Sequence, residues 1–333
     1  MPKFLILRFS SIGDIVLTTP VVRALKEQVP EAEIHFLTKR SFEPVLQHNP
    51  YIDRLHTFFE NPNECLDTLR GEHFDAIIDL HHNQRTFWIK RALKSSLKSA
   101  SVFSFRKLNI EKWLLVNFNI NRLPDVHIVD RYLETVSDFG VRNDGKGLDY
   151  FIGEGDRKAV EKLPAAVRNN FVAAAIGAQH GTKRLPTEKL IAICKQLDRH
   201  VVLLGGDNDR ETGERIAEAV GAHVINLCGS LSINESAAVV EKAAVVLTHD
   251  TGLMHIAAAF KRPIVSVWGN TVPQFGMTPY YGDVKVPNKL FEVSGLSCRP
   301  CSKIGFETCP KKHFRCMTQQ DEAAIARAIN HVV

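Results

Sequence analysis

The sequence lacks any apolar run that approaches the roughly 20 residues needed to cross a lipid bilayer. Its N-terminal apolar stretch is too short for a signal peptide and no small-residue cleavage site follows it, so we expect a chain that is not exported. Internal repeats and low-complexity tracts are also missing, and 44% hydrophobic with 24% charged residues are ordinary globular proportions. Disordered, collagen-like and coiled-coil chains are therefore excluded. Seven cysteines without an export signal predict a reducing, cytoplasmic location.

The length of 333 residues exceeds what one hydrophobic core usually fills, so we expect two domains of about 150 residues each. Short β-rich runs alternate with helical periodicity in two series. The first series has strands expected at 4–9, 33–37, 75–80 and 101–105, and helices at 21–28 and 85–98. The second has strands expected at 171–177, 200–205, 223–226, 244–248 and 263–268, and helices at 187–197, 210–220, 235–242 and 253–260. This alternation predicts an α/β protein of two doubly wound, Rossmann-like domains with parallel sheets.

The domain boundary is expected between residues 141 and 170, where a turn-rich stretch precedes a weakly patterned polar segment. We place the N-terminal domain at residues 1–155 and the C-terminal domain at residues 156–333. The last helix, at 321–333, is amphipathic and could pack back on the N-terminal domain. In paired domains of this kind ligands bind at the carboxyl ends of the strands, which predicts a cleft between the domains as the site.

The first motif, Ser10-Ser11-Ile12-Gly13-Asp14, directly follows the first expected strand. Gly13 permits a tight turn, and Asp14 falls at the start of the next helix. A carboxylate there can be an N-cap that accepts orphan backbone N–H bonds, or a general base displayed at the edge of the sheet. The loop has no G-x-G-x-x-G spacing, so it is not a dinucleotide-binding fingerprint.

The second motif, residues 249–259, follows the strand expected at 244–248. Asp250, Thr251 and Gly252 would form the N-terminus of a helix, where free N–H groups and the helix dipole favour a diphosphate. His255 lies one turn after Thr251 on the same face and could reach the same anion, although an isolated histidine is more often a packed structural residue.

Two further loops follow strands of the second series. One carries Thr182 and Lys183, a hydroxyl and a cation suited to phosphate oxygens, unless it is a plain solvated connection. The other carries Asp209, whose carboxylate could hold ribose hydroxyls. Each signal is weak alone, but their common position at strand ends of one domain favours a nucleotide site.

These motifs resemble those of the ADP-heptose-using lipopolysaccharide heptosyltransferases, glycosyltransferase family 9, over nearly the whole chain. The resemblance rests on residues 10–14 and 250–255. It implies the GT-B fold and an inverting glycosyltransferase that carries a heptose from ADP-heptose to a lipopolysaccharide inner-core acceptor of the Kdo-lipid A type, without a metal or other cofactor. It also implies that Asp14 is the general base and that Arg8 lies near the reaction centre. The implied donor contacts are Thr182, Lys183, Asp209, Asp250, Thr251, Gly252 and His255.

Residues 85–112 hold eight basic side chains against one acidic one, a local charge of +7 that exceeds the net +5 of the whole chain. On periodicity alone, a solvated helix face and an anion-binding or membrane-surface helix both remain open. The acceptors of the resembled family are phosphorylated glycolipids at the inner membrane, which favours the second interpretation. We therefore expect the acceptor, and a peripheral contact with the inner face of that membrane, near Arg85, Lys90, Arg91, Lys94 and Lys98.

Four cysteines, Cys298, Cys301, Cys309 and Cys316, lie within 19 residues of sequence. One C-x-x-C pair fits a zinc site, but the second half lacks such a pair. A structural zinc, a disulfide-prone loop and packing thiols therefore all remain open.

Two rival functions are also considered. One is a GT-B transferase or an epimerase that uses another nucleotide sugar. The other is a nucleic-acid-binding protein that uses the basic segment; it is disfavoured because aromatic residues for base stacking are sparse there and the phosphate-type loops would be unexplained. We accordingly expect a monomer with no nucleic-acid partner.

Overall fold

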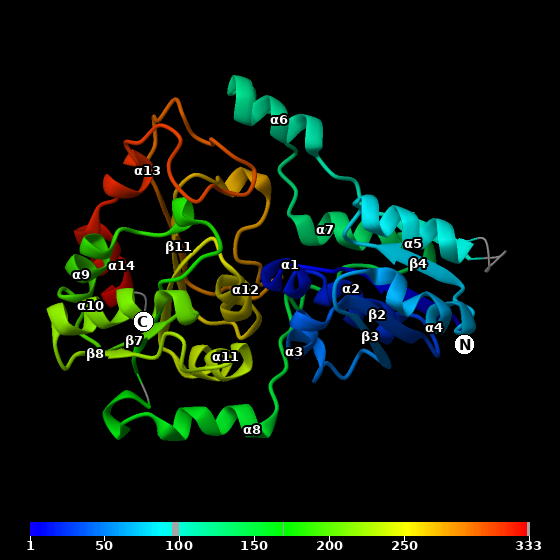
Figure 1. The fold of residues 1–333 in the computed structure, drawn as a ribbon, viewed down its shortest axis with the longest axis horizontal. Helices are drawn as coiled ribbons and strands as arrows, with labels where there is room; N and C mark the ends of the chain where they lie inside the picture. Colours follow the sequence, from blue (N-terminus) through cyan, green and yellow to red (C-terminus); the bar gives the residue numbers. More distant parts are fainter. Residues whose placement is uncertain (95–99, 169, 332–333) are drawn as a thin grey trace. The chain divides into compact units, whose positions relative to one another are not determined.

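The computed structural model describes residues 1–94, 100–168 and 170–331, and the contacts divide the chain into two compact units (Figure 1). Unit 1 comprises Met1–Lys107 and Val126–Phe151, whereas unit 2 comprises Leu108–Asp125 and Ile152–Val333. Residues 108–125 precede the expected boundary in the sequence, yet they group with unit 2.

Unit 1 is built on a parallel sheet of five strands in the order β3-β2-β1-β4-β5. Its central strand β1 is almost wholly apolar and its last four residues are buried, as expected for a strand covered on both faces. The strands are β1 (Lys3–Leu7), β2 (Glu33–Lys39), β3 (Arg54–Phe58), β4 (Ala76–Asp79) and β5 (Ser101–Ser104). The α-helices are α1 (Ile12–Val16), α2 (Thr19–Gln28), α3 (Glu43–Leu46), α4 (Leu66–Gly71), α5 (Gln84–Lys94) and α7 (Ile128–Leu133).

Unit 2 has a parallel sheet of six strands in the order β11-β10-β9-β6-β7-β8. The strands are β6 (Val172–Ala175), β7 (Val201–Leu204), β8 (Val224–Asn226), β9 (Val245–His249), β10 (Ile264–Trp268) and β11 (Asn288–Glu292). The α-helices are α6 (Asn109–Phe118), α8 (Glu154–Arg157), α9 (Thr187–Cys194), α10 (Arg210–Val220), α11 (Ile233–Lys242), α12 (Gly252–Ala259), α13 (Arg315–Thr318) and α14 (Glu322–His331). The predicted α/β class with two parallel, doubly wound sheets is confirmed.

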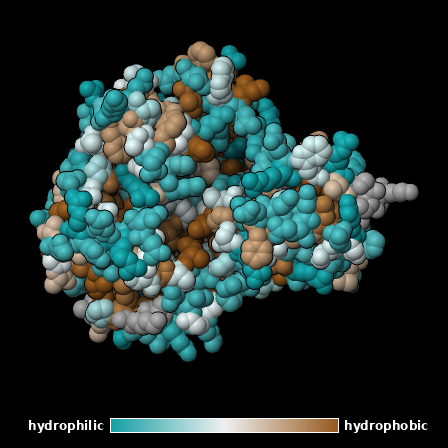
Figure 2. Space-filling view, viewed as in Figure 1, coloured by the Kyte–Doolittle hydropathy of each residue, from teal (hydrophilic) through white to brown (hydrophobic). Residues whose placement is uncertain are grey.

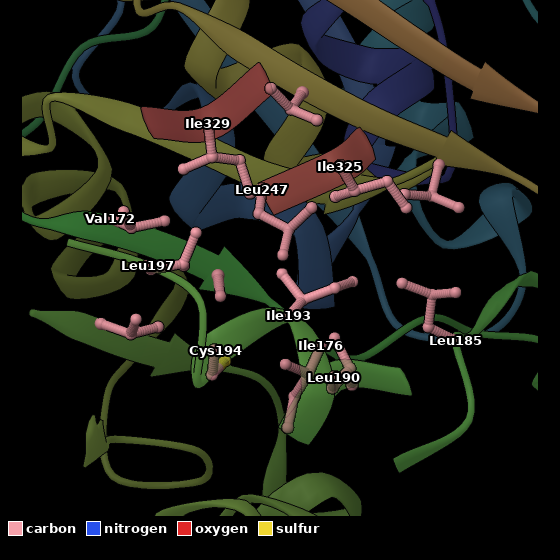
Figure 3. Packing of buried hydrophobic residues seen from close by; sticks show 14 of the residues in the cluster. Val172, Ile176, Leu185, Leu190, Ile193, Cys194, Leu197, Leu247, Ile325 and Ile329 are labelled. Carbon is pink, nitrogen blue, oxygen red and sulfur yellow. The ribbon is translucent and has the colours of Figure 1, made fainter. Parts of the chain in front are cut away.

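The core of unit 2 joins its last helix to its sheet (Figure 3). Ile325 and Ile329 of α14 pack with Ile193 of α9 and Leu247 of β9 in one buried cluster. Lys189 adds an ion pair to Glu322, with Nζ and Oε1 2.7 Å apart. These contacts of α14 lie within its own unit, and its packing on the N-terminal domain stays a prediction.

The edge strands β3 and β11 and helix α6 are among the elements that were not predicted from the sequence. The edge strands β3 and β11 carry charged or polar residues among their apolar ones, so neither shows an unbroken apolar run. Helix α6 begins near the end of the basic segment and continues beyond it, so the charge there masked its apolar residues. The helix expected at 85–98 is described as α5, and residues 95–99 at its end lie outside the described part of the chain.

Candidate active site

Asp14 lies at the carboxyl end of β1, on the first turn of α1. Its Oδ2 accepts hydrogen bonds from the Ser11 hydroxyl at 2.7 Å and from the Ser11 backbone N–H at 3.2 Å. Ser11 therefore occupies the N-cap position, and Asp14 reaches back to it from the third helical residue. The predicted helix-start position of Asp14 is correct, but the cap itself is the serine. The Asp14 side chain remains 23% exposed, so a substrate hydroxyl can reach it.

The other oxygen of Asp14 is paired with a buried guanidinium. Arg8 Nη2 lies 2.7 Å from Asp14 Oδ1, and its other nitrogens donate to the carbonyls of Leu80 and Ser10 and to the Tyr132 hydroxyl. Burial lowers the pKa of Arg8, but the attraction of Asp14, with Tyr132 and Asp79, outweighs it and raises that pKa. Burial also raises the pKa of Tyr132 to about 12, so its hydroxyl stays protonated at neutral pH. Arg8 is a fixed, permanent cation.

A second carboxylate lies behind this pair, at the end of β4. Asp79 has no exposed surface, and its Oδ1 accepts the backbone N–H groups of His81 and His82 at 3.0 and 2.7 Å. Lys90 of α5 pairs with its Oδ2 at 2.6 Å and also donates to the Ser104 hydroxyl. Burial, followed by the charge of Arg8, lowers the pKa of His81 to about 4.

This pairing removes one lysine from the basic, solvent-facing side that was expected on α5. Lys90 forms an ion pair with Asp79, and its side chain is only 14% exposed. It is therefore not one of the cations that α5 presents to solvent. Arg85, Arg91 and Lys94 are exposed, as expected. Lys98 lies outside the described residues. The solvent-facing charge of the described helix is therefore smaller than its sequence suggested.

In unit 2, the strand-end loops meet at Asp250. Lys183 Nζ lies 2.6 Å from Asp250 Oδ2, and the Thr271 hydroxyl donates to the same oxygen at 2.9 Å. Thr251 takes the N-cap position of α12, and Gly252 is its first helical residue. The structure thus brings Lys183, Asp250, Thr251 and Gly252 together at one helix start, where backbone N–H groups favour an anion. Thr271 had no sequence signal, because it stands alone after β10.

Two other predicted donor contacts are engaged within the protein. The buried Thr182 hydroxyl donates to the Phe306 carbonyl at 2.9 Å and accepts the Phe306 N–H at 2.9 Å, so it anchors this loop. Asp209 is also buried; its Oδ2 accepts the Gly206 N–H at 2.9 Å and its Oδ1 pairs with Arg184 at 2.9 Å. A Cβ at Gly177 would lie 2.1 Å from this carboxylate, which explains the glycine.

Two histidines flank the start of α12. His255 is on the helix, as predicted, but only 2% exposed. His249, at the end of β9, accepts the Leu185 N–H through Nε2 at 3.0 Å and so fixes the loop that carries Lys183. Burial, followed by the charge of Arg184, lowers the pKa of His249 to about 4. This histidine was not singled out by the sequence, because it resembles an ordinary strand residue.

One group of potential metal ligands lies in the described part of the chain, within unit 1. Ligand atoms of His35, His56 and Glu72 lie within 4.8 Å of one another. They are already engaged: His35 contacts His56 at 2.9 Å and Glu33 at 2.8 Å, while Glu72 pairs with Lys3 and Arg54. The four clustered cysteines are free thiols that form no comparably close group, although Cys298 Sγ lies 3.7 Å from His313 Nε2.

Two doubly wound parallel sheets are the architecture of the GT-B fold, which the chain shares with solved glycosyltransferase structures. Residues 64–304 match the profile of glycosyltransferase family 9 (heptosyltransferase), and the chain belongs to this family.

The chain is similar to named members of the family over most of its length. It is 26% identical to lipopolysaccharide heptosyltransferase 3 of Escherichia coli (strain K12) over 277 residues, which cover 78% of this chain and 80% of the relative. It is also 26% identical to lipooligosaccharide heptosyltransferase 2 of Haemophilus influenzae (strain ATCC 51907 / DSM 11121 / KW20 / Rd), covering 91% and 93%. The fold matches the crystal structure of the family 9 glycosyl transferase from Veillonella parvula DSM 2008, with a TM-score of 0.76, 21% identity and coverage of 99% and 97%. It also matches E. coli ADP-heptose lps heptosyltransferase II, with a TM-score of 0.73, 19% identity and coverage of 99% and 98%.

We expect His249 to make the protein less stable in mild acid. Its pKa is lowered in the folded state, so the unfolded chain binds more protons between about pH 6.5 and pH 4. The stability it contributes is complete above about pH 6.5 and is lost as the pH falls toward 4. Between pH 7.5 and pH 5 this amounts to about 2 kcal/mol. Gln can still accept the Leu185 N–H without titrating, so denaturant unfolding of His249→Gln should show a smaller loss over this interval than wild type. An equal loss would contradict the assignment.

Proposed function

We propose that this protein is an inverting heptosyltransferase that transfers a heptose from ADP-heptose to a lipopolysaccharide inner-core acceptor of the Kdo-lipid A type, at the cytoplasmic face of the inner membrane. The observation that carries this proposal is the pair of strand-end constellations: a carboxylate fixed at the end of β1, and a cationic helix start at α12. One suits an acceptor hydroxyl and the other a nucleoside diphosphate. The family relationship supports the sugar class, and the solved structure of E. coli heptosyltransferase WaaC with ADP supports an ADP-linked donor.

In the proposed reaction Asp14 removes the proton of an acceptor hydroxyl as that oxygen attacks the anomeric carbon. The carbon–oxygen bond to the diphosphate breaks in the same displacement, and attack from the opposite face inverts the configuration. Arg8 holds Asp14 in one orientation, since it is itself fixed by three further hydrogen bonds.

The leaving diphosphate gains negative charge as the bond breaks. The N-terminus of α12 at Thr251 and Gly252, with Lys183 and His255, would stabilise this charge. Lys183 is held against Asp250, so binding the diphosphate involves sharing or releasing that ion pair. Asp209 and Thr182 stay in the proposed donor site as residues that shape its loops, in keeping with their internal partners.

The acceptor is proposed to lie near the exposed cations of α5, Arg85, Arg91 and Lys94. Its phosphates would be attracted by these side chains, and the attraction would weaken with salt because exposed charges are screened over about 8 Å at physiological ionic strength. The monomeric state and the absence of a nucleic-acid partner remain predictions.

The activity is tested by incubating the protein with a panel of nucleotide sugars and the Kdo-lipid A acceptor, and by mass spectrometry of the products. We expect a heptose adduct with ADP-heptose. Transfer of another sugar would establish the rival transferase, isomerised donor would establish an epimerase, and salt-dependent retention on DNA without any transfer would revive the nucleic-acid alternative.

Replacing the proposed base should abolish turnover without unfolding the protein. Asp14→Asn keeps the size of the side chain and its contact with Ser11 but cannot accept the acceptor proton, so we expect a rate about 10²–10⁴-fold lower. Asp67→Asn is the matched control, since this α4 carboxylate is 98% exposed in the same unit. Steady-state kinetics and calorimetry with ADP supply the measurement. Near-normal turnover of Asp14→Asn would reduce Asp14 to a helix-capping residue.

Two lysine substitutions should separate the donor and acceptor sites. Lys183→Ala removes a charged partner of the diphosphate, a contact of about 1.5–3 kcal/mol, so ADP affinity should fall roughly tenfold to hundredfold. Lys94→Ala, on exposed α5, should leave ADP affinity unchanged and raise the KM for the glycolipid, with the larger effect at low salt. Calorimetry and kinetics over a salt series measure both. Unchanged ADP affinity in Lys183→Ala would place the nucleotide elsewhere.

A further inference from the structure

Helix α6 exposes large apolar side chains to solvent. Ile110 is 72% exposed, Trp113 49% and Phe118 58%, and Ile120 just after the helix is 46% exposed. The opposite side of the helix is also apolar, because Leu115 packs with Val272 and Phe275 of unit 2. A helix that is hydrophobic both where it packs and where it faces solvent leaves an exposed apolar surface, which is typical of a site that contacts a second apolar partner.

A loop of the same unit extends this apolar surface. Lys303 Nζ donates to the Asn109 carbonyl at 3.2 Å, and Asn119 Nδ2 donates to the Ser297 carbonyl at 3.4 Å, so both ends of α6 are joined to residues 297–303. The loop then exposes Ile304 by 64% and Phe306 by 41%. Figure 1 shows α6 beside this loop, and Figure 2 shows hydrophobic residues among hydrophilic ones at the edge of the molecule where α6 lies.

The apolar side chains are accompanied by positive charge. Residues 298–316 hold five basic residues and one acidic one, a local charge of +4 in a chain of net charge +5. Lys303, Lys311, Lys312 and Arg315 are exposed. Tryptophan, phenylalanine and isoleucine side chains beside lysines form the pattern of segments that lie in a membrane interface, where the rings enter the headgroup boundary and the cations meet anionic lipids.

We propose that residues 109–120 and 297–315, together the α6 surface, dock this protein on an anionic lipid bilayer. The inference deepens the proposed function, since a glycolipid acceptor is presented at such a bilayer. No helix in the described part of the chain could span a membrane, which fits a contact at the interface. A protein partner is disfavoured because exposed lysines are depleted at the centre of protein interfaces and enriched where cations meet lipid headgroups.

Helix α5 is the competing surface. It exposes Phe87 by 52% and Trp88 by 60%, and Trp88 with Arg85 lines a hollow that also contains Glu60. The α6 surface has six exposed apolar side chains against these two, and its loop supplies four exposed cations against one acidic residue. We therefore assign insertion to α6 and leave to α5 the attraction of acceptor phosphates.

Vesicle co-sedimentation with matched variants tests the assignment. Ile110→Ser/Trp113→Ser/Phe118→Ser removes the free side of α6, and Phe59→Ser/Phe87→Ser/Trp88→Ser removes three equally exposed apolar residues of unit 1. With vesicles of phosphatidylglycerol and phosphatidylcholine, we expect the α6 variant to bind at least about tenfold more weakly than wild type and the control to bind like wild type. Lys303→Glu/Lys311→Glu/Lys312→Glu should lose binding to these vesicles as well, and wild-type binding should fall with phosphatidylcholine alone.

Tryptophan fluorescence reports insertion directly, because the chain has three tryptophans and Trp268 is only 1% exposed. In Trp88→Phe, anionic vesicles should shift the emission of Trp113 to the blue. In Trp113→Phe, the remaining exposed Trp88 should show no such shift. A shift confined to Trp88, or equal vesicle binding by the α6 variant and wild type, would overturn the proposal.

Two further readouts keep this inference separate from the activity. A deacylated, soluble acceptor bypasses the bilayer, so the α6 variant should use it as well as wild type does, provided that the proposed function holds. Vesicle binding without any heptose transfer would remove the proposed function and leave the docking surface standing. Light scattering tests whether a second copy of the chain binds the α6 surface instead. If the wild type were a dimer that the α6 variant converts to a monomer, with vesicle binding unchanged, the surface would be an interface between copies and the proposal would be overturned.

Discussion

The ion pair between Arg8 and Asp14 is the constraint on which unit 1 depends. A guanidinium buried at the end of β1 needs acceptors for its N–H groups, and a carboxylate that must accept a proton needs a fixed orientation. One contact answers both needs. It also explains the residues behind it: Tyr132 and the Leu80 carbonyl complete the hydrogen bonds of Arg8, and Asp79 adds a second buried negative charge that Lys90 balances.

In unit 2, contacts between loops hold a charged site residue, Lys183, in place. The segment that carries Lys183 is tied at three points: Thr182 to Phe306, Leu185 to His249, and Arg184 to Asp209. Each tie joins this segment to a different part of unit 2, so Lys183 is held without using its own side chain. Its ammonium group contacts the carboxylate and the backbone carbonyl of Asp250, so a fixed loop presents this charge beside the start of α12. Preorganised cations of this kind stabilise a leaving anion with little rearrangement.

Sequence patterns predicted the parts of this molecule that depend on local chemistry. Buried parallel strands are continuous apolar runs, and Asp14 and residues 250–252 follow such runs directly, so both the sheets and the site positions could be read. The direction of individual side chains could not be predicted in this way. The four-residue spacing of the α5 lysines does not indicate that Lys90 pairs with the buried Asp79. Likewise, the loop sequence around Asp209 does not indicate that its carboxylate pairs with Arg184. Those pairings join residues far apart in the sequence, and only the fold selects them.

The same limit applies to residues 108–125. By sequence they belong to the first half of the chain, and the basic segment at 85–112 runs into them. The fold divides that segment: α5 stays in unit 1, while α6 packs Leu115 on Val272 and Phe275 in unit 2. The polypeptide therefore passes between the units three times, at 107/108, 125/126 and 151/152. A cut at 155/156 would remove α6 from the unit it covers and expose Val272 and Phe275. Unit 2 is thus complete only in the context of the whole chain, because its α6 cover lies in the sequence between the two segments of unit 1.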